Sequence, residues 1–241
     1  MNVNNCNTLF VSAYYDLNNN PENKAFRLQQ LEKLVALQFP LLLFCDESIY
    51  ESIKHYQSPY VQLVKKDIHS IQTFMQLSSS PLELPPYRNV EKDNQTFMAF
   101  MNSKVEFLDY VSILYPKKQN YVWVDAALMK IIQNPNSMKE KLDALQTYTQ
   151  PKILFPGYAT STPIHELFQK VLWRFLGGFL VVPKILLPRF RAECDQLLQS
   201  CISIKKLTWE VNIWAYVEYK HPDLFHYYFG DHNDSIVQWS A

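Results

Sequence analysis

Residues 121–127, with the sequence YVWVDAA, run from an apolar stretch suited to a buried strand into one carboxylate and two small residues. Open α/β sheets bind ligands beyond the carboxyl ends of their strands, and Asp125 would lie at such an end. The stretch therefore favours an α/β domain and makes Asp125 the first candidate for a ligand contact.

Short apolar runs alternate with helical patterns along the chain, an order typical of an α/β sheet. Strands are predicted over residues 8–14, 40–45, 60–64, 121–125, 152–156, 176–182 and 224–229. Helices are predicted over residues 23–38, 46–56, 68–77, 94–115, 138–147, 188–201 and 208–220. The second strand is a continuous apolar run, which is typical of a strand covered on both faces. We predict an α/β fold with a Rossmann-like, mostly parallel central sheet flanked by helices.

Residues 78–94 are rich in Ser and Pro and interrupt this alternation. Because sheet-like signals resume after them, we interpret them as a mobile or active-site loop and not as a linker between domains. Residues 1–241 are therefore expected to form a single domain.

The charge balance argues against nucleic acid as a partner. The 23 Lys and Arg residues equal the 23 Asp and Glu residues in number. A net charge of zero gives no broad attraction to nucleic acid or to an anionic membrane surface. With 48% hydrophobic and 19% charged residues, the chain has the composition of a globular protein.

The sequence favours a soluble, cytoplasmic protein. The N-terminal residues MNVNNCN lack the basic and apolar regions of a signal peptide. The most apolar window, residues 171–188, is interrupted by Arg174, Lys184 and two prolines, so no transmembrane segment is expected. The four cysteines have no metal-binding spacing and fit reduced thiols. Nothing in the sequence indicates the oligomeric state.

Charged residues fall on the apolar faces of two predicted helices. Lys104 would either extend its ammonium group to water or neutralise a diphosphate. Arg27 would either bind a phosphate with two N–H groups or pair with an acid such as Asp46 or Asp125.

A third charge, Glu210, interrupts the apolar face of the helix predicted over residues 208–220. Thr208 is the predicted N-cap of that helix. Glu210 would either interact with the helix dipole or hold and activate an acceptor hydroxyl group. Three charges on three inward faces indicate a polar site inside the domain.

The motifs also have a recognisable serial order. They are TLFVSAYYDL, FPLLLFCDE, LPPY followed by MNSKVEFL, VWVDAALMK, FLGGFLVV, LTWEVNIWAYVE and a terminal FGDH. This order resembles the HtrL/YibB-type (WlaTC-related) glycosyltransferase-like proteins and, more broadly, enzymes of the GT-A fold. The resemblance covers nearly the whole chain and rests on the order of the motifs.

The resemblance implies a binding site for a nucleotide-sugar. The end of the first strand in such enzymes contacts the base and ribose, which here implies Ser12, Ala13, Tyr14 and Asp16. The acidic DxD motif that binds a divalent metal and the diphosphate corresponds to Asp125-Ala126-Ala127, so its second acid is missing.

One carboxylate cannot fill the coordination shell of Mn²⁺ or Mg²⁺. Either the diphosphate and waters complete the shell with help from Asp231 or His232, or the enzyme is metal-independent and Lys104 and Arg27 neutralise the diphosphate. The resemblance places the late metal or phosphate contact of the fold at Gly230-Asp231-His232.

Two further segments have implied roles. Gly177 and Gly178 resemble the small-residue segment beside the donor sugar, because a backbone without Cβ can approach a ligand closely. A β-bulge is the structural alternative for the pair. Glu210 corresponds to the acid near the acceptor or the donor sugar.

The resemblance therefore implies transfer of a sugar from a UDP- or GDP-sugar to a hydroxyl group of a glycan or related acceptor. The glycine pair and the late histidine weakly favour a retaining reaction. One alternative is a catalytically inactive GT-A-like domain that serves as a binding module, which the missing second acid favours. Another is a Rossmann-like enzyme such as a nucleotidyltransferase, although neither GxGxxG nor GxxxxGK[ST] occurs.

Overall fold

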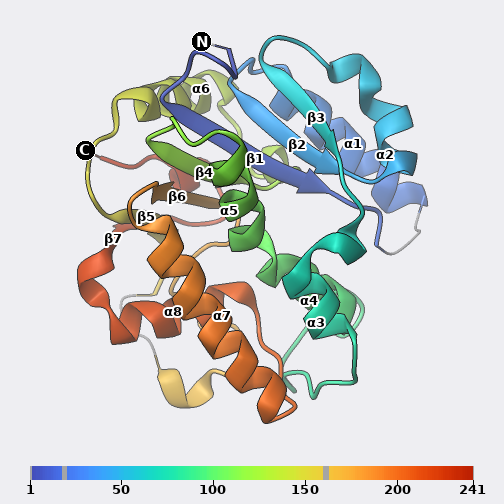
Figure 1. Cartoon of the computed structure of the whole chain (residues 1–241), viewed down its shortest axis with the longest axis vertical. Helices are drawn as coiled ribbons and strands as arrows, with labels where there is room; N and C mark the ends of the chain where they lie inside the picture. Colours follow the sequence, from blue (N-terminus) through green and yellow to red (C-terminus); the bar gives the residue numbers. More distant parts are fainter. Residues whose placement is uncertain (1, 18–20, 160–162, 241) are drawn as a thin grey trace.

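The computed structural model describes residues 2–17, 21–159 and 163–240. Within these residues, seven strands form one sheet in the order β3-β2-β1-β4-β6-β5-β7 (Figure 1). The strands are β1 (Thr8–Tyr14), β2 (Leu41–Cys45), β3 (Val61–Lys65), β4 (Asn120–Val124), β5 (Ile153–Gly157), β6 (Phe179–Pro183) and β7 (Phe225–Phe229). β6 runs antiparallel to its neighbours β4 and β5, and the other pairs are parallel. The predicted α/β class with a mostly parallel sheet is confirmed.

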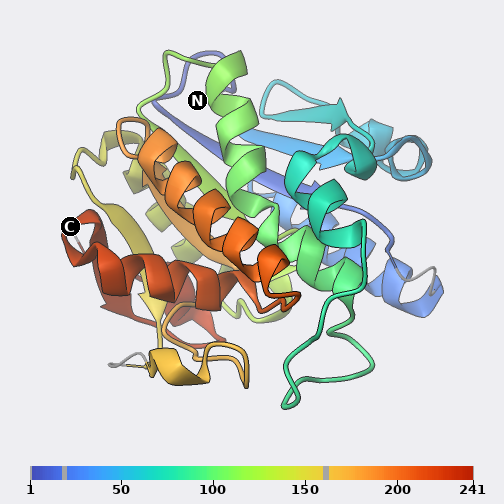
Figure 2. The same ribbon diagram turned by 60° about the horizontal axis from the view of Figure 1, so that its bottom comes forward.

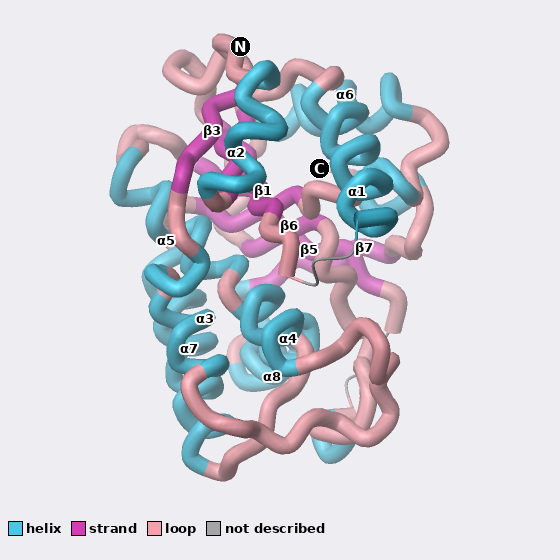
Figure 3. The backbone as a smooth tube through the Cα atoms, turned by 90° about the vertical axis from the view of Figure 1, so that its right-hand side faces the viewer, coloured by secondary structure: helices cyan, strands magenta, loops and turns pink. Residues whose placement is uncertain are grey.

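Helices cover both faces of the sheet (Figures 1 and 3). They are α1 (Pro21–Val35), α2 (Glu47–Ile53), α3 (Gln72–Ser78), α4 (Gln95–Asn102), α5 (Lys104–Leu114), α6 (Pro135–Ala144), α7 (Leu187–Ser203) and α8 (Glu210–Lys220). α1, α2 and α6 contribute to the core on one face, and α3, α4, α5, α7 and α8 contribute to the core on the other. In the described part of the chain, no helix is both long and apolar enough to cross a membrane.

The strand sequences fit this three-layer arrangement. Every residue of β1, β2, β4 and β6 is buried. Successive side chains of a strand point to opposite faces, so Val11 packs in the core with α5 while Phe10 packs in the core with α1. This explains why the strands are nearly continuous apolar runs and not alternating patterns.

The prediction of one continuous helix over residues 94–115 is wrong, because two helices, α4 and α5, meet at Ser103. The Ser103 hydroxyl donates to the carbonyl of Ala99 at 2.8 Å, a bond that bends helices. The break makes Lys104 the first residue of α5. The region predicted as a helix over residues 68–77 is also divided, into a 3-10 turn (Ile68–Ser70) and α3.

Thr208 is not the N-cap of α8. Trp209 holds that position without a side-chain hydrogen bond. The Thr208 hydroxyl instead donates to the carbonyl of Leu167 at 2.6 Å and accepts from Nδ2 of Asn212 at 2.9 Å. Since no side chain caps the first turn of α8, Glu210 is the acid that faces the positive end of the helix dipole.

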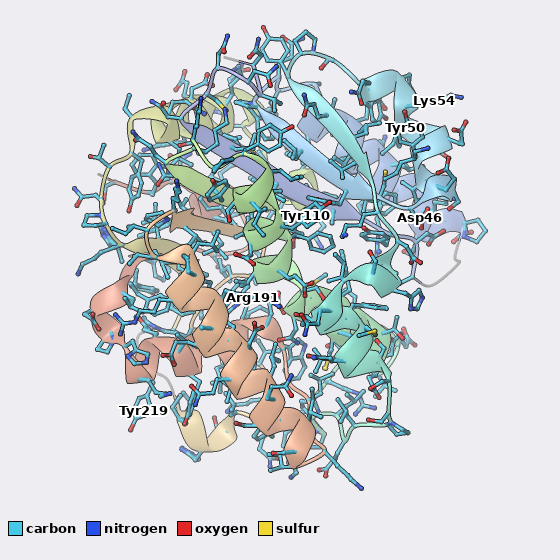
Figure 4. The ribbon with its side chains drawn as sticks, in the orientation of Figure 1. Asp46, Tyr50, Lys54, Tyr110, Arg191 and Tyr219 are labelled. Atoms are coloured by element: carbon cyan, nitrogen blue, oxygen red, sulfur yellow. The ribbon has the colours of Figure 1, made fainter. Side chains whose placement is uncertain are left out.

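Polar contacts connect neighbouring helices around Arg191 on α7, which is labelled in Figure 4. Arg191 on α7 donates to Asp195 on the same helix at 2.7 Å and to Glu106 on α5 at 3.2 Å. Glu106 in turn accepts from the backbone N–H groups of Gln72 and Thr73 at the start of α3. This chain of bonds links three helices on the face of the sheet that also carries Lys104.

Candidate active site

A pocket of about 940 Å³ opens at the carboxyl edge of the sheet. β1 lies between β2 and β4, so the strand order reverses between β1 and β4. The pocket is lined by Ala13 and Tyr14 at the end of β1 and by residues 125–128 directly after β4. Open α/β sheets bind ligands at such a switch point.

Loops and helix starts form the other walls. The loop after α3 contributes residues 87–89, 92 and 93, and the segment between β5 and β6 contributes residues 163, 166 and 170–173. Figure 2 shows the loop after α3 extending at the bottom of the view, near the segment after β5. The two are joined where the N–H of Tyr87 donates to the carbonyl of Gln169 at 3.1 Å. The loop predicted over residues 78–94 therefore contributes to the pocket.

Lys104 is the centre of a buried charge cluster. Its Nζ atom lies 2.9 Å from Oε1 of Glu210, 3.1 Å from Oδ1 of Asp125 and 2.8 Å from the carbonyl oxygen of Gly177. Its side chain has no solvent exposure. An ammonium group has three N–H donors, so these contacts leave Lys104 no free donor for a diphosphate.

The charges of two carboxylates have a larger effect on the pKa of Lys104 than its burial has. Burial by itself lowers the pKa of a lysine, but the nearby charges of Asp125 and Glu210 raise the pKa of Lys104 above its usual value. The charged form is therefore the stable one inside the fold. Lys104 fixes the positions of the two carboxylates relative to each other.

Asp125 keeps one oxygen for the pocket. Trp123 and Asp125 are two residues apart at the end of β4 and lie on the same face, so Nε1 of Trp123 donates to Oδ1 of Asp125 at 2.6 Å. Lys104 binds the same oxygen. In the described residues Oδ2 has no hydrogen-bond partner, and the side chain is 34% exposed. The carboxylate is thus held by one oxygen and available through the other.

The antiparallel direction of β6 brings the glycine pair to this site. Val124 is paired with Phe179, so the residues before β6 lie beside the carboxyl end of β4. The N–H of Asp125 donates to the carbonyl of Gly178 at 2.9 Å. The pair precedes β6, although the sequence placed it inside a strand over residues 176–182.

Close approach explains the glycine at position 177. A Cβ atom there would lie 2.3 Å from Oε1 of Glu210 and 3.2 Å from Nζ of Lys104. At Gly178 a Cβ atom would meet Leu128 at 3.0 Å and Oδ2 of Asp125 at 3.7 Å. Gly177 therefore makes room for the ion pair, and Gly178 keeps the space beside the open oxygen of Asp125.

Besides Arg27 and Lys104, the pocket is lined by Arg88, Lys92, Lys130 and Lys170, which were not predicted from the sequence as site residues. Lys130 follows Asp125 by five residues in a 3-10 turn (Leu128–Lys130), and Lys92 comes from the loop after α3. Arg27, which was predicted, also lines the pocket. The motif DAALMK held a signal for Lys130, because a short turn after a strand keeps its residues near the strand end.

Three predicted site residues lie outside the pocket lining. Ser12 is fully buried, and its hydroxyl has no partner among the described residues. Asp16 lies 3.9 Å from Lys24 in an ion pair. Asp231 accepts from the N–H of His232 at 2.7 Å. All other predicted site residues line the pocket, and Ser12, Asp16 and Asp231 do not.

Side chains alone do not form a complete site for a divalent metal ion in the described part of the pocket. Among the described residues, no three or more His, Cys, Asp or Glu side chains are grouped to hold one. His232 lines the pocket, but its ring packs edge-on against Trp173 with 5.0 Å between centroids. A hard cation needs several oxygen ligands, and Asp125 offers one free oxygen.

The Trp173 side chain lines the pocket beside His232. Trp173 is 45% exposed and has a φ of 53°, a left-handed conformation that is rare for a bulky residue. Its carbonyl accepts from the N–H groups of Tyr158 and Ala159 at 3.2 and 2.9 Å. Arg174, paired with Glu218 at 2.6 Å, also donates to the carbonyl of Ala159 at 3.0 Å. These bonds hold the Trp173 indole at the pocket.

No protein-family model and no curated protein matches this chain. Solved structures with a similar course of the chain include a glycosyltransferase involved in the glycosylation of the major capsid of PBCV-1, with 11% identity, a TM-score of 0.46 and coverage of 93% of this chain and 81% of that one. A second is the 4-diphosphocytidyl-2C-methyl-D-erythritol synthase of Anaerococcus prevotii DSM 20548, with 11% identity, a TM-score of 0.44 and coverage of 96% and 94%. Glycosyl transfer and the synthase activity are properties of those two proteins.

Proposed function

We propose that this protein is a glycosyltransferase that uses a nucleotide-sugar donor. The observation that carries the proposal is the pocket of about 940 Å³ at the switch point between β1 and β4, with Asp125 in its wall. Such crevices bind nucleotides in open α/β sheets, and this volume suits a small-molecule ligand. The GT-A-like order of the sequence motifs supports the same assignment.

The donor would lie across the carboxyl ends of β1 and β4. Ala13 and Tyr14 provide the wall for the base and ribose. Oδ2 of Asp125 would accept hydrogen bonds from hydroxyl groups of the ribose or the donor sugar. Gly178 leaves room for the sugar beside that oxygen.

The acceptor would enter along the aromatic wall. Trp173 and Tyr158 line the pocket and expose 45% and 53% of their surfaces. Aromatic rings pack well against the apolar face of a sugar ring while their polar atoms keep contact with water. This wall supports a glycan as the acceptor class.

The reaction breaks the bond between the anomeric carbon of the sugar and the diphosphate oxygen, and the electron pair stays on the diphosphate. The acceptor oxygen forms the new bond to the anomeric carbon. In an inverting reaction Glu210 would take the proton of the acceptor hydroxyl through its second carboxylate oxygen. In a retaining reaction the departing diphosphate would take that proton, and Glu210 would only position the sugar. The configuration of the product distinguishes these roles.

A thermal-shift screen of UDP-, GDP- and other nucleotide-sugars, with and without Mn²⁺, tests the proposal. A ligand at about 100 times its Kd adds about 2.7 kcal/mol, which is an increase in Tm of roughly 5–10 °C for a chain of this size. Asp125→Asn should abolish that shift and sugar transfer, whereas the surface variant Asp143→Asn should not. The absence of a shift with every nucleotide and nucleotide-sugar would overturn the proposal.

A catalytically inactive binding domain is the second candidate. The observation that favours it is that Lys104 binds both Asp125 and Glu210. Such a domain would bind a nucleotide-sugar or glycan without releasing nucleoside diphosphate. Measurement of nucleoside diphosphate released over time from a bound donor separates the two candidates.

A further inference from the structure

Four cationic side chains of the pocket lack an anionic partner among the described residues, and one of them, Arg88, donates to the carbonyl of Pro85 at 3.0 Å. Arg27, Lys92 and Lys130 line the pocket, and none forms an ion pair within 4.0 Å with any residue in the described ranges. Lys104 and Lys170 line the same pocket and are paired, Lys170 with Glu166 at 2.8 Å. Nζ of Lys92 also lies 5.0 Å from the centroid of the Phe97 ring, so what Arg27, Lys92 and Lys130 lack is an anion, which a bound ligand could supply.

The three cations come from different elements and face a common space. Arg27 belongs to α1, Lys92 to the loop after α3, and Lys130 to the turn after β4. Loss of solvent around the ammonium group lowers the pKa of Lys130, and the positive charges of Lys92, Arg27 and Lys104 lower it further, against Asp125. Like charges at one site are unfavourable until a polyanion binds.

Asp125 and Glu210 are poorly placed to bind a divalent cation, which is the other way to neutralise a diphosphate. Oδ1 of Asp125 already accepts from Trp123 and contacts Lys104 at 3.1 Å. The ammonium group of Lys104 lies against both Asp125 and Glu210 and would repel a second cation placed near them. The positive charge that a metal ion would bring is present in the same pocket as the side chains of Arg27, Lys92 and Lys130.

We infer that Arg27, Lys92 and Lys130 bind the diphosphate of the donor directly, without a divalent metal ion. The inference rests on the proposed function and names the subsite that completes it. The guanidinium group of Arg27 can form two parallel hydrogen bonds to phosphate oxygens, and the two ammonium groups supply further charge. As the bond to the sugar breaks, the diphosphate gains negative charge, which these fixed cations stabilise.

Calorimetric titration of the full chain with UDP and with inorganic pyrophosphate, in EDTA and then in Mn²⁺, tests the inference. Both ligands should bind in EDTA with affinities that Mn²⁺ changes by less than about threefold. Arg27→Met, Lys92→Met and Lys130→Met should each weaken pyrophosphate binding by about tenfold or more. Lys139→Met, which removes a surface lysine of α6, should not weaken it.

The outcomes separate this inference from the proposed function. Binding of UDP only when Mn²⁺ is present would overturn the inference and leave the proposed function standing. Binding in EDTA that survives all three substitutions would also overturn it. The absence of binding by UDP, pyrophosphate and every nucleotide-sugar under both conditions would overturn both. If a methionine variant lacks the far-UV circular dichroism of the wild type, the glutamine variant at that position replaces it.

Discussion

Lys104 and Glu210 are 106 residues apart in the sequence, yet Nζ of Lys104 lies 2.9 Å from Oε1 of Glu210. The pair joins the first residue of α5 to the first residue of α8. Asp125 at the end of β4 completes the cluster. Three elements that enter the pocket are therefore fixed by one buried ammonium group.

Replacement of Lys104 by Met should destabilise the fold strongly. Removal of one partner from a buried ion pair leaves uncompensated charge and costs about 3–5 kcal/mol. Urea denaturation of the variant measures the loss in free energy of unfolding. Lys139→Met, which breaks an exposed pair with Asp143, should cost less than about 0.5 kcal/mol. If the two variants lose the same amount, the cluster does not stabilise the fold.

The raised pKa of Lys104 sets the pH dependence of that loss. A raised pKa in the folded state contributes stability that is complete below the pKa of an unfolded lysine, about 10.4, and disappears as pH rises through the higher folded value. The difference in free energy of unfolding between wild type and Lys104→Met should thus stay constant from about pH 7 to 9. A difference that decreases within this range would show that the ion pair is not its source.

Gly177→Ala and Gly178→Ala should reduce the free energy of unfolding by clearly different amounts. The added Cβ lies 2.3 Å from a carboxylate oxygen held by Lys104 at position 177, but 3.0 Å from the end of the Leu128 side chain at position 178. We expect Gly177→Ala to cost about 1–3 kcal/mol and Gly178→Ala less, because a leucine methyl group can move more easily than a paired carboxylate. Thermal denaturation compares the two variants. Equal losses would contradict the close-approach explanation.

The affinity for UDP should decrease at alkaline pH because of Lys130. The pKa of Lys130 is lowered by its burial, with Lys92, Arg27 and Lys104 adding to the effect and Asp125 opposing it. Lys130 therefore loses its charge at a less alkaline pH than an ordinary lysine, whose pKa is about 10.4, while the diphosphate group of UDP stays fully ionised. Titrations of UDP at increasing pH should show this decrease in wild type.

Lys130→Arg provides the control for this pH profile, since arginine keeps its charge throughout the range. The decrease should move to higher pH in the variant. If the two profiles coincide, Lys130 is not the titrating group.

Trp173→Ala and Trp173→Gly distinguish the contribution of the indole ring from the cost of the left-handed backbone at this position. Both variants remove the ring, but glycine also removes the cost of a left-handed backbone, about 1–2 kcal/mol. We expect the glycine variant to be the more stable of the two by about 1 kcal/mol in urea denaturation. Both should retain wild-type affinity for pyrophosphate and lose affinity for a glycan acceptor. A loss of pyrophosphate affinity would place the indole at the donor instead.

Local patterns of the sequence predicted the strands well. β1 spans the residues predicted for it, 8–14, and β4 ends one residue before its prediction. A strand covered on both faces needs a run of apolar residues, and such a run is visible without any knowledge of its neighbours. The same pattern placed Asp125 at the carboxyl edge of the sheet.

Helix boundaries depended on competing hydrogen bonds that periodicity does not reveal. The Ser103 hydroxyl bonds back to Ala99 and breaks one predicted helix, and the Thr208 hydroxyl bonds to Leu167 instead of capping α8. In each case a side chain had two possible partners, and only the packed structure selected one.

The sequence by itself determined the α/β class, the strand that carries Asp125 and the presence of charges on inward faces. The tertiary structure decided which charges meet. Lys104 lies against two carboxylates, whereas Arg27, Lys92 and Lys130 have no ion-pair partner among the described residues. The physical reason is the separation along the sequence of the residues that interact. Apolar periodicity is a property of neighbouring residues, whereas the partner of a charge depends on the direction of β6 and on contacts between residues about a hundred positions apart.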